Sequence, residues 1–321
     1  AKATRDAVVS KLNAKNFAML DNSPNVDVYT AHAKFVSNKV VEISANGETK
    51  QLEGEIVVIN TGAKNNVLPI PGLTTSKNVY DSTEFQQLEK APKTLGIIGG
   101  GNIGLEFANL YARLGVKVTV IDFAPGILGR EDKDIAELAQ GYLEEVGIEF
   151  KLGTATKEIR NNGELVVVDT EKYGELEFEA VLHATGRRAN TEGLGLENTD
   201  IELRPNGTIV VDEFCQTAVE NVFAVGDVNG GLQFTYVSLD DFRVVNGYLH
   251  GNKEYTTADR KNVPYSTFIS PALSHVGLHK EEAEAAYPNV AVASLPVANM
   301  PRGAVNQDPR GLFRVTVDKD T

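Results

Sequence analysis

The chain has 321 residues, a net charge of −13 and a single cysteine, Cys215. Its length exceeds what one hydrophobic core usually organises, and the one cysteine excludes an intrachain disulfide, a cysteine-based zinc site and a CxxC motif within these residues. The acidic balance argues against a nucleic-acid partner, and no apolar run is long enough to span a membrane. We therefore expect a cytoplasmic, multidomain α/β protein with neither nucleic acid nor a membrane as partner.

The N-terminal part of the chain predicts a long helix followed by a small antiparallel meander. The helix is expected over residues 4–20 and the three strands of the meander at residues 26–36, 39–44 and 48–52. A buried strand then ends in Thr61-Gly62. After a proline-rich linker, a helix is expected over residues 81–90, with Asp81 or Ser82 as its N-cap.

After residue 93 the pattern changes to alternating strands and helices. Strands are expected at residues 94–98, 116–122, 148–152 and 180–185. One helix ends at Gly115, a second over residues 132–146 ends at Gly147, and the turn at residues 161–163 predicts a hairpin before the last strand. We expect each helix to present one apolar stripe, made of Ile103, Phe107, Leu110 and Leu114 in the first and Ile135, Leu138, Tyr142 and Val146 in the second.

The remaining segments predict strands at residues 208–212, 222–225, 266–269, 290–295 and 312–317, and helices at residues 239–249 and 280–286. The chain begins at Ala1 without a methionine and stops at Thr321, just after the last of these strands. The turn-like residues 318–321 predict a hairpin whose second arm is absent. We therefore expect the chain to be an internal fragment of a longer protein.

The turn after the strand at residues 94–98 has the pattern Gly99-x-Gly101-x-x-Gly104. Such glycine patterns recur by chance, but this one follows a buried strand and opens an amphipathic helix, which indicates a dinucleotide site. The first glycine permits the tight turn, the second lets backbone approach a pyrophosphate, and the third lets helix and strand pack closely. The helix N-terminus, with Asn102 and Ile103, then stabilises the pyrophosphate.

Asp122 ends the next strand and is the candidate partner of the nucleotide ribose. Its carboxylate can accept hydrogen bonds from a ribose diol but repels a 2′-phosphate, so the sequence favours NAD(H) over NADP(H). Arg130, nearby in the sequence, would weaken that preference. The alternative interpretation of the glycine pattern is a tight turn that binds no ligand.

Residues 220–228 (ENVFAVGDV) resemble the second flavin-binding motif of the FAD-dependent pyridine nucleotide–disulfide oxidoreductases, the glutathione reductase and lipoamide dehydrogenase family. The likeness extends through residues 182–190, 95–108 and 271–283, the last of which resembles the start of that family's dimerisation domain. It covers essentially the whole chain, in order. Residues 230–241 and 259–265 further resemble the bacterial reactive-chlorine-resistance flavoprotein branch, whose members reduce hypothiocyanous acid or cupric ions with NADH.

The resemblance implies an α/β fold with two Rossmann-like dinucleotide-binding domains and a truncated α+β dimerisation domain. The implied boundaries are residues 1–90 for a partial FAD-binding domain, 91–186 for a complete NAD(P)H-binding domain, 187–262 for the returning part of the FAD-binding domain and 263–321 for the start of the dimerisation domain. It also implies FAD and NAD(H) as cofactors, a small-molecule or disulfide substrate, and a homodimer in the full-length protein.

The same resemblance assigns roles to individual residues. Asp227, which follows Gly226, is assigned to the hydroxyls of the flavin's ribityl chain, where a carboxylate suits because charge-assisted hydrogen bonds are short and strong. Phe234 and Thr235 lead into a helix whose N-terminus faces the isoalloxazine. Glu106 matches the glutamate near the nicotinamide that pairs with a lysine of the redox-cysteine helix, and it is the candidate catalytic residue. Four further candidates for cofactor binding lie in strand-end motifs that flank the nucleotide domain: Thr61, Gly62, Gly186 and Arg187.

Several features of the family are absent from these 321 residues. They are the first Gly-x-Gly-x-x-Gly with its acidic residue, the CxxxxC redox pair and the C-terminal His–Glu pair. In addition, Asn102 stands where members often carry Tyr or Val beside the nicotinamide pocket. Cys215 matches no redox position and is interpreted as an inert, half-buried thiol. His275 and His279 are interpreted as surface or interface residues, and the other histidines share no ligand spacing, so no metal site is predicted.

The leading hypothesis is that the parent protein is a flavoprotein oxidoreductase, in which electrons pass from NADH via FAD to a cysteine pair and then to an oxidised substrate. The fragment itself is then expected to be inactive. A second hypothesis is that the chain, as it stands, is a nicotinamide-nucleotide-binding module without turnover. Another two-dinucleotide flavoprotein, such as a ferredoxin reductase or NADH oxidase, is disfavoured by residues 271–283. The terminal electron acceptor stays open.

Overall fold

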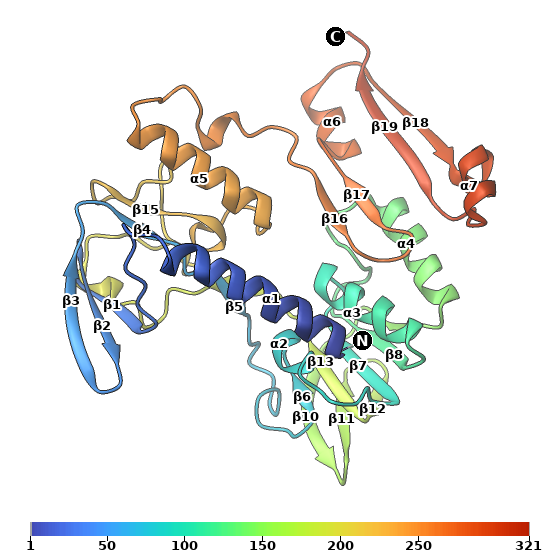
Figure 1. Ribbon diagram of the computed structural model, residues 1–321. Coiled ribbons are helices and arrows are strands. Elements are labelled where there is room, and N and C mark those ends of the chain that lie inside the picture. The colour runs from blue at the N-terminus through green and yellow to red at the C-terminus, as the bar shows by residue number, and fades with distance from the viewer. Residues whose placement is uncertain (1, 321) are drawn as a thin grey trace. The chain divides into compact units, whose positions relative to one another are not determined.

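The computed structural model describes residues 2–320, which divide into two compact α/β units (Figure 1). Within the described residues, unit 1 combines residues 2–64 with 187–260, and unit 2 combines residues 65–186 with 261–320. Residues 65–90, which the sequence assigns to the FAD-binding domain, therefore lie in unit 2. Ala1 and Thr321, the predicted ends of the fragment, lie outside the described residues.

Unit 1 begins with the long helix α1 (Lys2–Asp21), followed by an antiparallel sheet of the order β1-β2-β3. The three strands span β1 (His32–Ser37), β2 (Val40–Ala45) and β3 (Glu48–Glu53). The predicted helix and meander are confirmed, but the first strand starts at His32 rather than at residue 26. His32 already pairs with Ser44, and β2 turns away at Asn46, so residues 26–31 have no partner strand.

The core of unit 1 lies around two parallel strands, β4 (Val57–Ile59) and β15 (Val222–Ala224). Other elements of the unit are β14 (Arg187–Ala189), which pairs with β5 (Ala63–Asn65), the short 3₁₀ helices η1 (Leu196–Asn198), η2 (Gly226–Asn229) and η3 (Thr257–Asp259), and helix α5 (Thr235–Leu249). The predicted strand at residues 208–212 is wrong. Only the isolated bridge between Ile209 and Leu203 forms there, because Val210 and Ile209 donate their backbone N–H groups to two different segments, at Glu202 and Val228.

Unit 2 contains a five-stranded parallel sheet of the order β6-β13-β7-β8-β9. Its strands are β6 (Val79–Tyr80), β7 (Thr94–Ile98), β8 (Lys117–Ile121), β9 (Glu149–Lys151) and β13 (Ala180–His183). One face packs against α3 (Asn102–Arg113) and α4 (Lys133–Glu145). The other face packs against the antiparallel sheet of β10 (Thr156–Asn162), β11 (Leu165–Thr170) and β12 (Gly174–Phe178). The sheet is therefore buried on both faces, as the alternating pattern predicted.

The predicted apolar stripes of α3 and α4 are displaced by one helix position. In α3 the buried apolar residues are Leu105 and Ala108, whereas Leu110 and Leu114 at its C-terminal end are half exposed, at 53% and 54%. In α4 the buried row is Ala136, Ala139 and Leu143, and the four predicted residues are only partly buried. The innermost row contains both small and large residues, with Leu105 and Leu143 fully buried, and the predicted Phe107 and Val146 pack against the edge of this core.

The predicted helix at residues 81–90 is one turn, α2 (Ser82–Phe85). Asp81 is its N-cap and accepts hydrogen bonds from the N–H groups of Thr83 and Glu84, as a capping box requires. Gly115 and Gly147 end α3 and α4 in left-handed backbone conformation, with φ of 87° and 90°, which confirms both predicted helix ends.

The C-terminal part of unit 2 contains β16 (Tyr265–Thr267), β17 (Leu273–His275), α6 (Lys280–Ala286), β18 (Val290–Pro296), η4 (Val297–Asn299), α7 (Pro301–Asn306) and β19 (Leu312–Asp318). The strands form two antiparallel pairs, β16 with β17 and β18 with β19 (Figure 1). The sequence did not predict β17 and α7. Among the described residues, no helix is both long and apolar enough to cross a membrane.

Candidate functional site

The glycine-rich turn of unit 2 connects β7 to α3. Gly99 has a φ of 117°, and a Cβ there would lie 2.4 Å from the backbone oxygen of Ala184. A Cβ on Gly104 would lie 2.0 Å from the backbone oxygen of Gly99. Real Cβ atoms are not found so close to backbone oxygen, so both positions require glycine, the first for the turn and the third for close packing of helix and strand.

Gly101 differs from the other two glycines of the motif. It is the exposed N-cap of α3, and a Cβ built on it would have no atom within 4 Å. Within the described part of the chain no side chain caps this helix end, and the first-turn residues Asn102 and Ile103 are partly exposed. The open space and uncapped N–H groups fit an anionic group such as a pyrophosphate.

Asp122 follows β8 and lies against the same turn. Its Oδ2 accepts the N–H of Gly100 at 2.5 Å and its Oδ1 accepts the N–H of Ala124 at 2.8 Å. The carboxylate therefore holds the turn in place, and each oxygen keeps a further lone pair for another donor. Arg130, the predicted modifier of nucleotide preference, is exposed.

Glu106 lies on α3, two residues after the last glycine of the motif. Its Oε1 accepts the backbone N–H of Phe268 at 2.9 Å, which links α3 to the segment after β16. Sequence reasoning did not anticipate this contact. The catalytic role of Glu106 stays a prediction, because the lysine with which the resemblance pairs it is not among these residues.

Unit 1 places its candidate residues at the ends of β4 and β15. Because the two strands are parallel, the turns that follow them, with Thr61-Gly62 and Gly226-Asp227, lie at the same edge of the sheet. A Cβ on Gly226 would lie 2.8 Å from Ser238 Oγ and 3.2 Å from Asn60 Oδ1, and the φ of Gly226 is 70°. The position therefore requires glycine, which brings the two turns into contact.

A buried ionic group, missed by the sequence analysis, holds the Gly226-Asp227 turn. Asp241, on α5, is 1% exposed, and its Oδ2 accepts the N–H of Gly226 at 2.7 Å and the side-chain amide of Asn229 at 3.1 Å. Its Oδ1 accepts a hydrogen bond from Arg260 at 2.6 Å. Arg260 also donates to Asp240 at 2.7 Å. Asp241 is therefore a positioning residue for the turn. The adjacent pair Asp240-Asp241 was the sequence feature that could have indicated this ionic group.

Asp227 has a half-buried side chain with no hydrogen-bond or ion-pair partner among the described residues 2–320. Its carboxylate oxygens are therefore available to a ligand that supplies hydroxyl groups. Nearby, Phe234 is the N-cap of α5, and no side chain caps this helix end. The exposed Thr235 forms its first turn, and the predicted helix start at residue 239 is corrected to Thr235.

The strand-end candidates Thr61 and Arg187 use their side chains on the protein itself. Thr61 Oγ1 donates to the backbone oxygen of Asn190 at 2.9 Å, and an Arg187 guanidinium nitrogen donates to the oxygen of Ala63 at 2.5 Å. Gly62 and Gly186 have φ of 68° and 97°, and a Cβ on either would meet nothing within 4 Å. Their role in cofactor binding stays a prediction.

Cys215 is fully buried, not half-buried as predicted. Burial and the neighbouring Asp241 carboxylate raise the pKa of its thiol to about 12, so the thiolate form is negligible near neutral pH. This explains why the only cysteine of the chain is unsuited to thiol redox chemistry.

The two units define an α/β protein with two strand-end sites of the kind that binds dinucleotides. Residues 1–241 match the family described as pyridine nucleotide-disulphide oxidoreductase, and residues 263–321 match the dimerisation domain of the same family. The chain belongs to the pyridine nucleotide-disulphide oxidoreductase family, as the resemblance predicted. Its members are enzymes that use FAD and NAD(P)H.

Individual relatives agree with this assignment. The chain is 42% identical to the probable pyridine nucleotide-disulfide oxidoreductase RclA of Escherichia coli, over 99% of this chain and 72% of that protein. It is 34% identical to dihydrolipoyl dehydrogenase of Bacillus subtilis, over 99% of this chain and 69% of that protein. A solved structure of the HOCl-induced flavoprotein disulfide reductase RclA from Escherichia coli superimposes with a TM-score of 0.95 and 42% identity, over 99% of this chain and 72% of that one. The predicted likeness to the reactive-chlorine-resistance branch is thus supported.

Proposed function

We propose that this chain is the nicotinamide-binding part and a portion of the flavin-binding part of an oxidoreductase that passes electrons from NADH via FAD to a cysteine pair and then to an oxidised substrate. Bound FAD supplies the two-electron redox chemistry that joins the nicotinamide to a disulfide. The observation that carries the proposal is Asp227, a half-buried carboxylate whose side chain has no partner among residues 2–320, at the end of a strand and beside the N-terminus of α5.

Within this proposal, the residues of the chain bind and orient. The uncapped N-terminus of α3 and the open space at Gly101 receive the diphosphate of NADH, and Asp122 accepts the ribose hydroxyls. Asp227 accepts hydroxyl groups of FAD, and the N-terminus of α5 provides a positive dipole end near it. Glu106 would act at the nicotinamide through a lysine outside these residues.

The substrate proposal follows one of the similar solved structures. One solved relative is a Cu(II) complex of HOCl-induced flavoprotein disulfide reductase RclA, which matches this chain with a TM-score of 0.94. We therefore infer an oxidant of the reactive-chlorine type, or a cupric ion, as the class of terminal acceptor. The match of residues 263–321 to a dimerisation domain supports a homodimer.

A specific observation favours a second function for the chain as it stands. Its single cysteine is fully buried with a pKa of about 12, so no thiol among the 321 residues can carry electrons. On this alternative, the chain binds the nicotinamide nucleotide and performs no turnover.

Flavin content separates the two functions. We expect the purified chain to be yellow after incubation with FAD and desalting, with the flavin's visible absorbance retained, because Asp227 and the α5 N-terminus are in place. A colourless protein whose fluorescence is still quenched when NADH is added would instead favour the binding module. A protein that binds neither flavin nor NADH would contradict both.

The nucleotide preference depends on Asp122. We expect the chain to bind NADH more tightly than NADPH by about tenfold, that is about 1.4 kcal/mol, because the carboxylate repels a 2′-phosphate. Asp122→Asn should remove most of that difference while keeping the side-chain shape. Fluorescence titration with both nucleotides measures it, and Glu149→Gln, an exposed carboxylate on β9, is the matched control. Equal affinities in the unmodified chain would overturn the role given to Asp122.

A further inference from the structure

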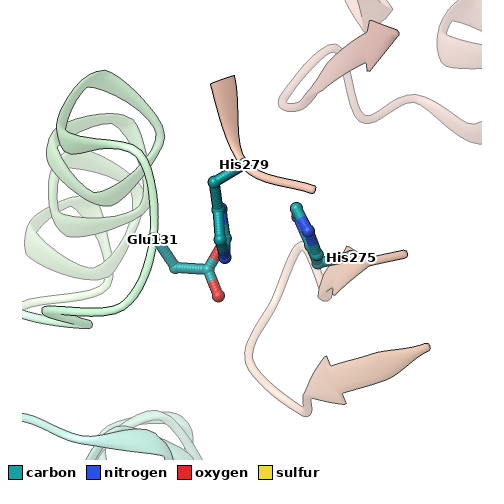
Figure 2. A group of neighbouring side chains, drawn as sticks. All are labelled: Glu131, His275 and His279. Carbon is teal, nitrogen blue, oxygen red and sulfur yellow. The ribbon is translucent and has the colours of Figure 1, made fainter. Parts of the chain in front are cut away.

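Outside the two cofactor sites, unit 2 brings together three side chains of metal-ligating type. Glu131 precedes α4, His275 ends β17, and His279 is the N-cap of α6. One potential ligand atom from each lies within 4.8 Å of the others. Figure 2 shows the Glu131 carboxylate and the two imidazole rings turned toward a common space. The sequence analysis interpreted both histidines as surface or interface residues and predicted no metal site.

The two imidazoles lie face to face, so each ring must rotate before both nitrogen lone pairs, which lie in the ring planes, can point at one ion. Their rings stack with centroids 3.9 Å apart and an interplanar angle of 21°. His275 Nε2 lies 2.9 Å from the backbone oxygen of Gly277. An N–H donated to that oxygen leaves the lone pair of Nδ1 free, and metal-bound histidines characteristically donate their second ring nitrogen to such an oxygen.

His279 lies beside a second carboxylate, at an ion-pair distance and not a hydrogen-bond distance. Its Nδ1 lies 3.7 Å from the Oδ1 of Asp132, which is itself held at 3.3 Å by Arg314. Its Nε2 lies 3.3 Å from the hydroxyl oxygen of Tyr265. That hydroxyl has one proton, and it donates to Glu131 Oε1 at 2.6 Å, so it cannot also donate to the imidazole. The His279 side chain also accepts the backbone N–H of Glu282 in the capping box of α6. With Nδ1 as that acceptor, Nε2 carries the proton and donates it to the Tyr265 oxygen, so an ion at Nε2 must displace this proton.

The surroundings suit a cation that enters from solvent. The His279 side chain is 18% exposed and the Asp132 side chain 16%, so the cluster lies near the surface without being fully solvated. Glu131 and Asp132 place two carboxylates beside the imidazoles. Two imidazole nitrogens and one carboxylate oxygen are the ligand set of borderline metals such as Zn²⁺, whereas Mg²⁺ and Ca²⁺ prefer oxygen alone.

We propose that Glu131, His275 and His279 bind one divalent transition-metal ion, with Zn²⁺ as its representative, and that water completes the coordination. The ion would join the loop before α4 to β17 and to the start of α6. It would therefore tie the first elements of the C-terminal segment to the nucleotide-binding sheet domain, a structural role separate from hydride transfer.

Calorimetric titration of the chelator-treated 321-residue chain with ZnCl₂ tests the site. We expect one equivalent of Zn²⁺ to bind and to raise the melting temperature, because the ion binds only the folded site. His275→Ala and His279→Ala should each weaken this binding by at least about tenfold, and Glu131→Gln should weaken it less. His32→Ala, which removes an exposed histidine of unit 1, is the matched control and should bind as the unmodified chain does.

Circular dichroism of each variant establishes that it is folded, and His275→Gln provides a substitution of similar size if alanine disturbs β17. Visible absorption of the Co²⁺-loaded chain reports nitrogen and oxygen ligands and should be lost in the histidine variants. The proposal is overturned if the unmodified chain binds no equivalent of Zn²⁺, if the His275→Ala/His279→Ala double variant binds as tightly as the unmodified chain, or if Mg²⁺ raises the melting temperature as much as Zn²⁺ does.

Discussion

Gly101→Ala is expected to weaken NADH binding by about a hundredfold while changing the free energy of unfolding by less than about 1 kcal/mol. The backbone at Gly101 has a φ of −84°, which alanine adopts without strain, and its Cβ would enter open space. That space is where the pyrophosphate must approach the helix N-terminus. The methyl group therefore costs binding and not folding.

Gly104→Ala is expected to reduce the stability of the fold first and NADH binding only as a consequence. Its Cβ would lie 2.0 Å from the Gly99 oxygen, and neither backbone can move without separating α3 from β7. We expect the free energy of unfolding to fall by about 3 kcal/mol, the upper range for overpacking, and NADH binding to fall as a consequence. Urea unfolding and NADH titration of both variants separate the two effects.

Gly141→Ala is the matched control for both glycine variants. Gly141 lies in the middle of α4, and a Cβ there would meet no atom within 4 Å. Alanine should stabilise that helix by up to about 1 kcal/mol and leave NADH binding unchanged. If Gly101→Ala bound NADH like the unmodified chain, the α3 N-terminus would not be the diphosphate site.

The sequence predicted best those features that depend on local chain geometry. Gly99, Gly115 and Gly147 all adopt positive φ, and such positions restrict the backbone whatever surrounds them. The predicted helix faces were displaced because the prediction followed the spacing of large apolar residues and left out the small Ala136 and Ala139, which are buried in the same row of α4 as Leu143.

The sequence predicted those candidate site residues that lie in or next to a recognisable motif. Gly226 and Asp227 follow a strand directly and belong to a recognisable run. Asp241, Arg260, His275 and His279 also lie in runs that carry the family resemblance, but only tertiary packing brings Asp241 to Arg260 and the two histidines to Glu131. Tyr265 and Glu131, which share a hydrogen bond beside these histidines, are 134 residues apart in the sequence.

Asp241→Asn is expected to lower both the stability and the flavin content of the protein. The substitution replaces the carboxylate that offsets the charge of Arg260 with a neutral amide. Because this breaks a buried ion pair, the free energy of unfolding should fall by about 3 kcal/mol. The substitution also weakens the hydrogen bond that fixes the N–H of Gly226. Asp240 contacts the same arginine but not the turn. Asp240→Asn should therefore lower the free energy of unfolding by about 1 kcal/mol and leave flavin content unchanged.

Asp227→Ala completes the comparison, because it removes a carboxylate that has no partner among the described residues. Since no protein contact is lost, the free energy of unfolding should change by less than about 0.5 kcal/mol, whereas flavin content should fall sharply. Chemical unfolding and the ratio of flavin to protein absorbance, in this chain and in the longer parent that the sequence predicts, measure both quantities. Unchanged flavin content in Asp227→Ala, together with reduced content in Asp241→Asn, would show that the shape of the turn and not its carboxylate holds the flavin.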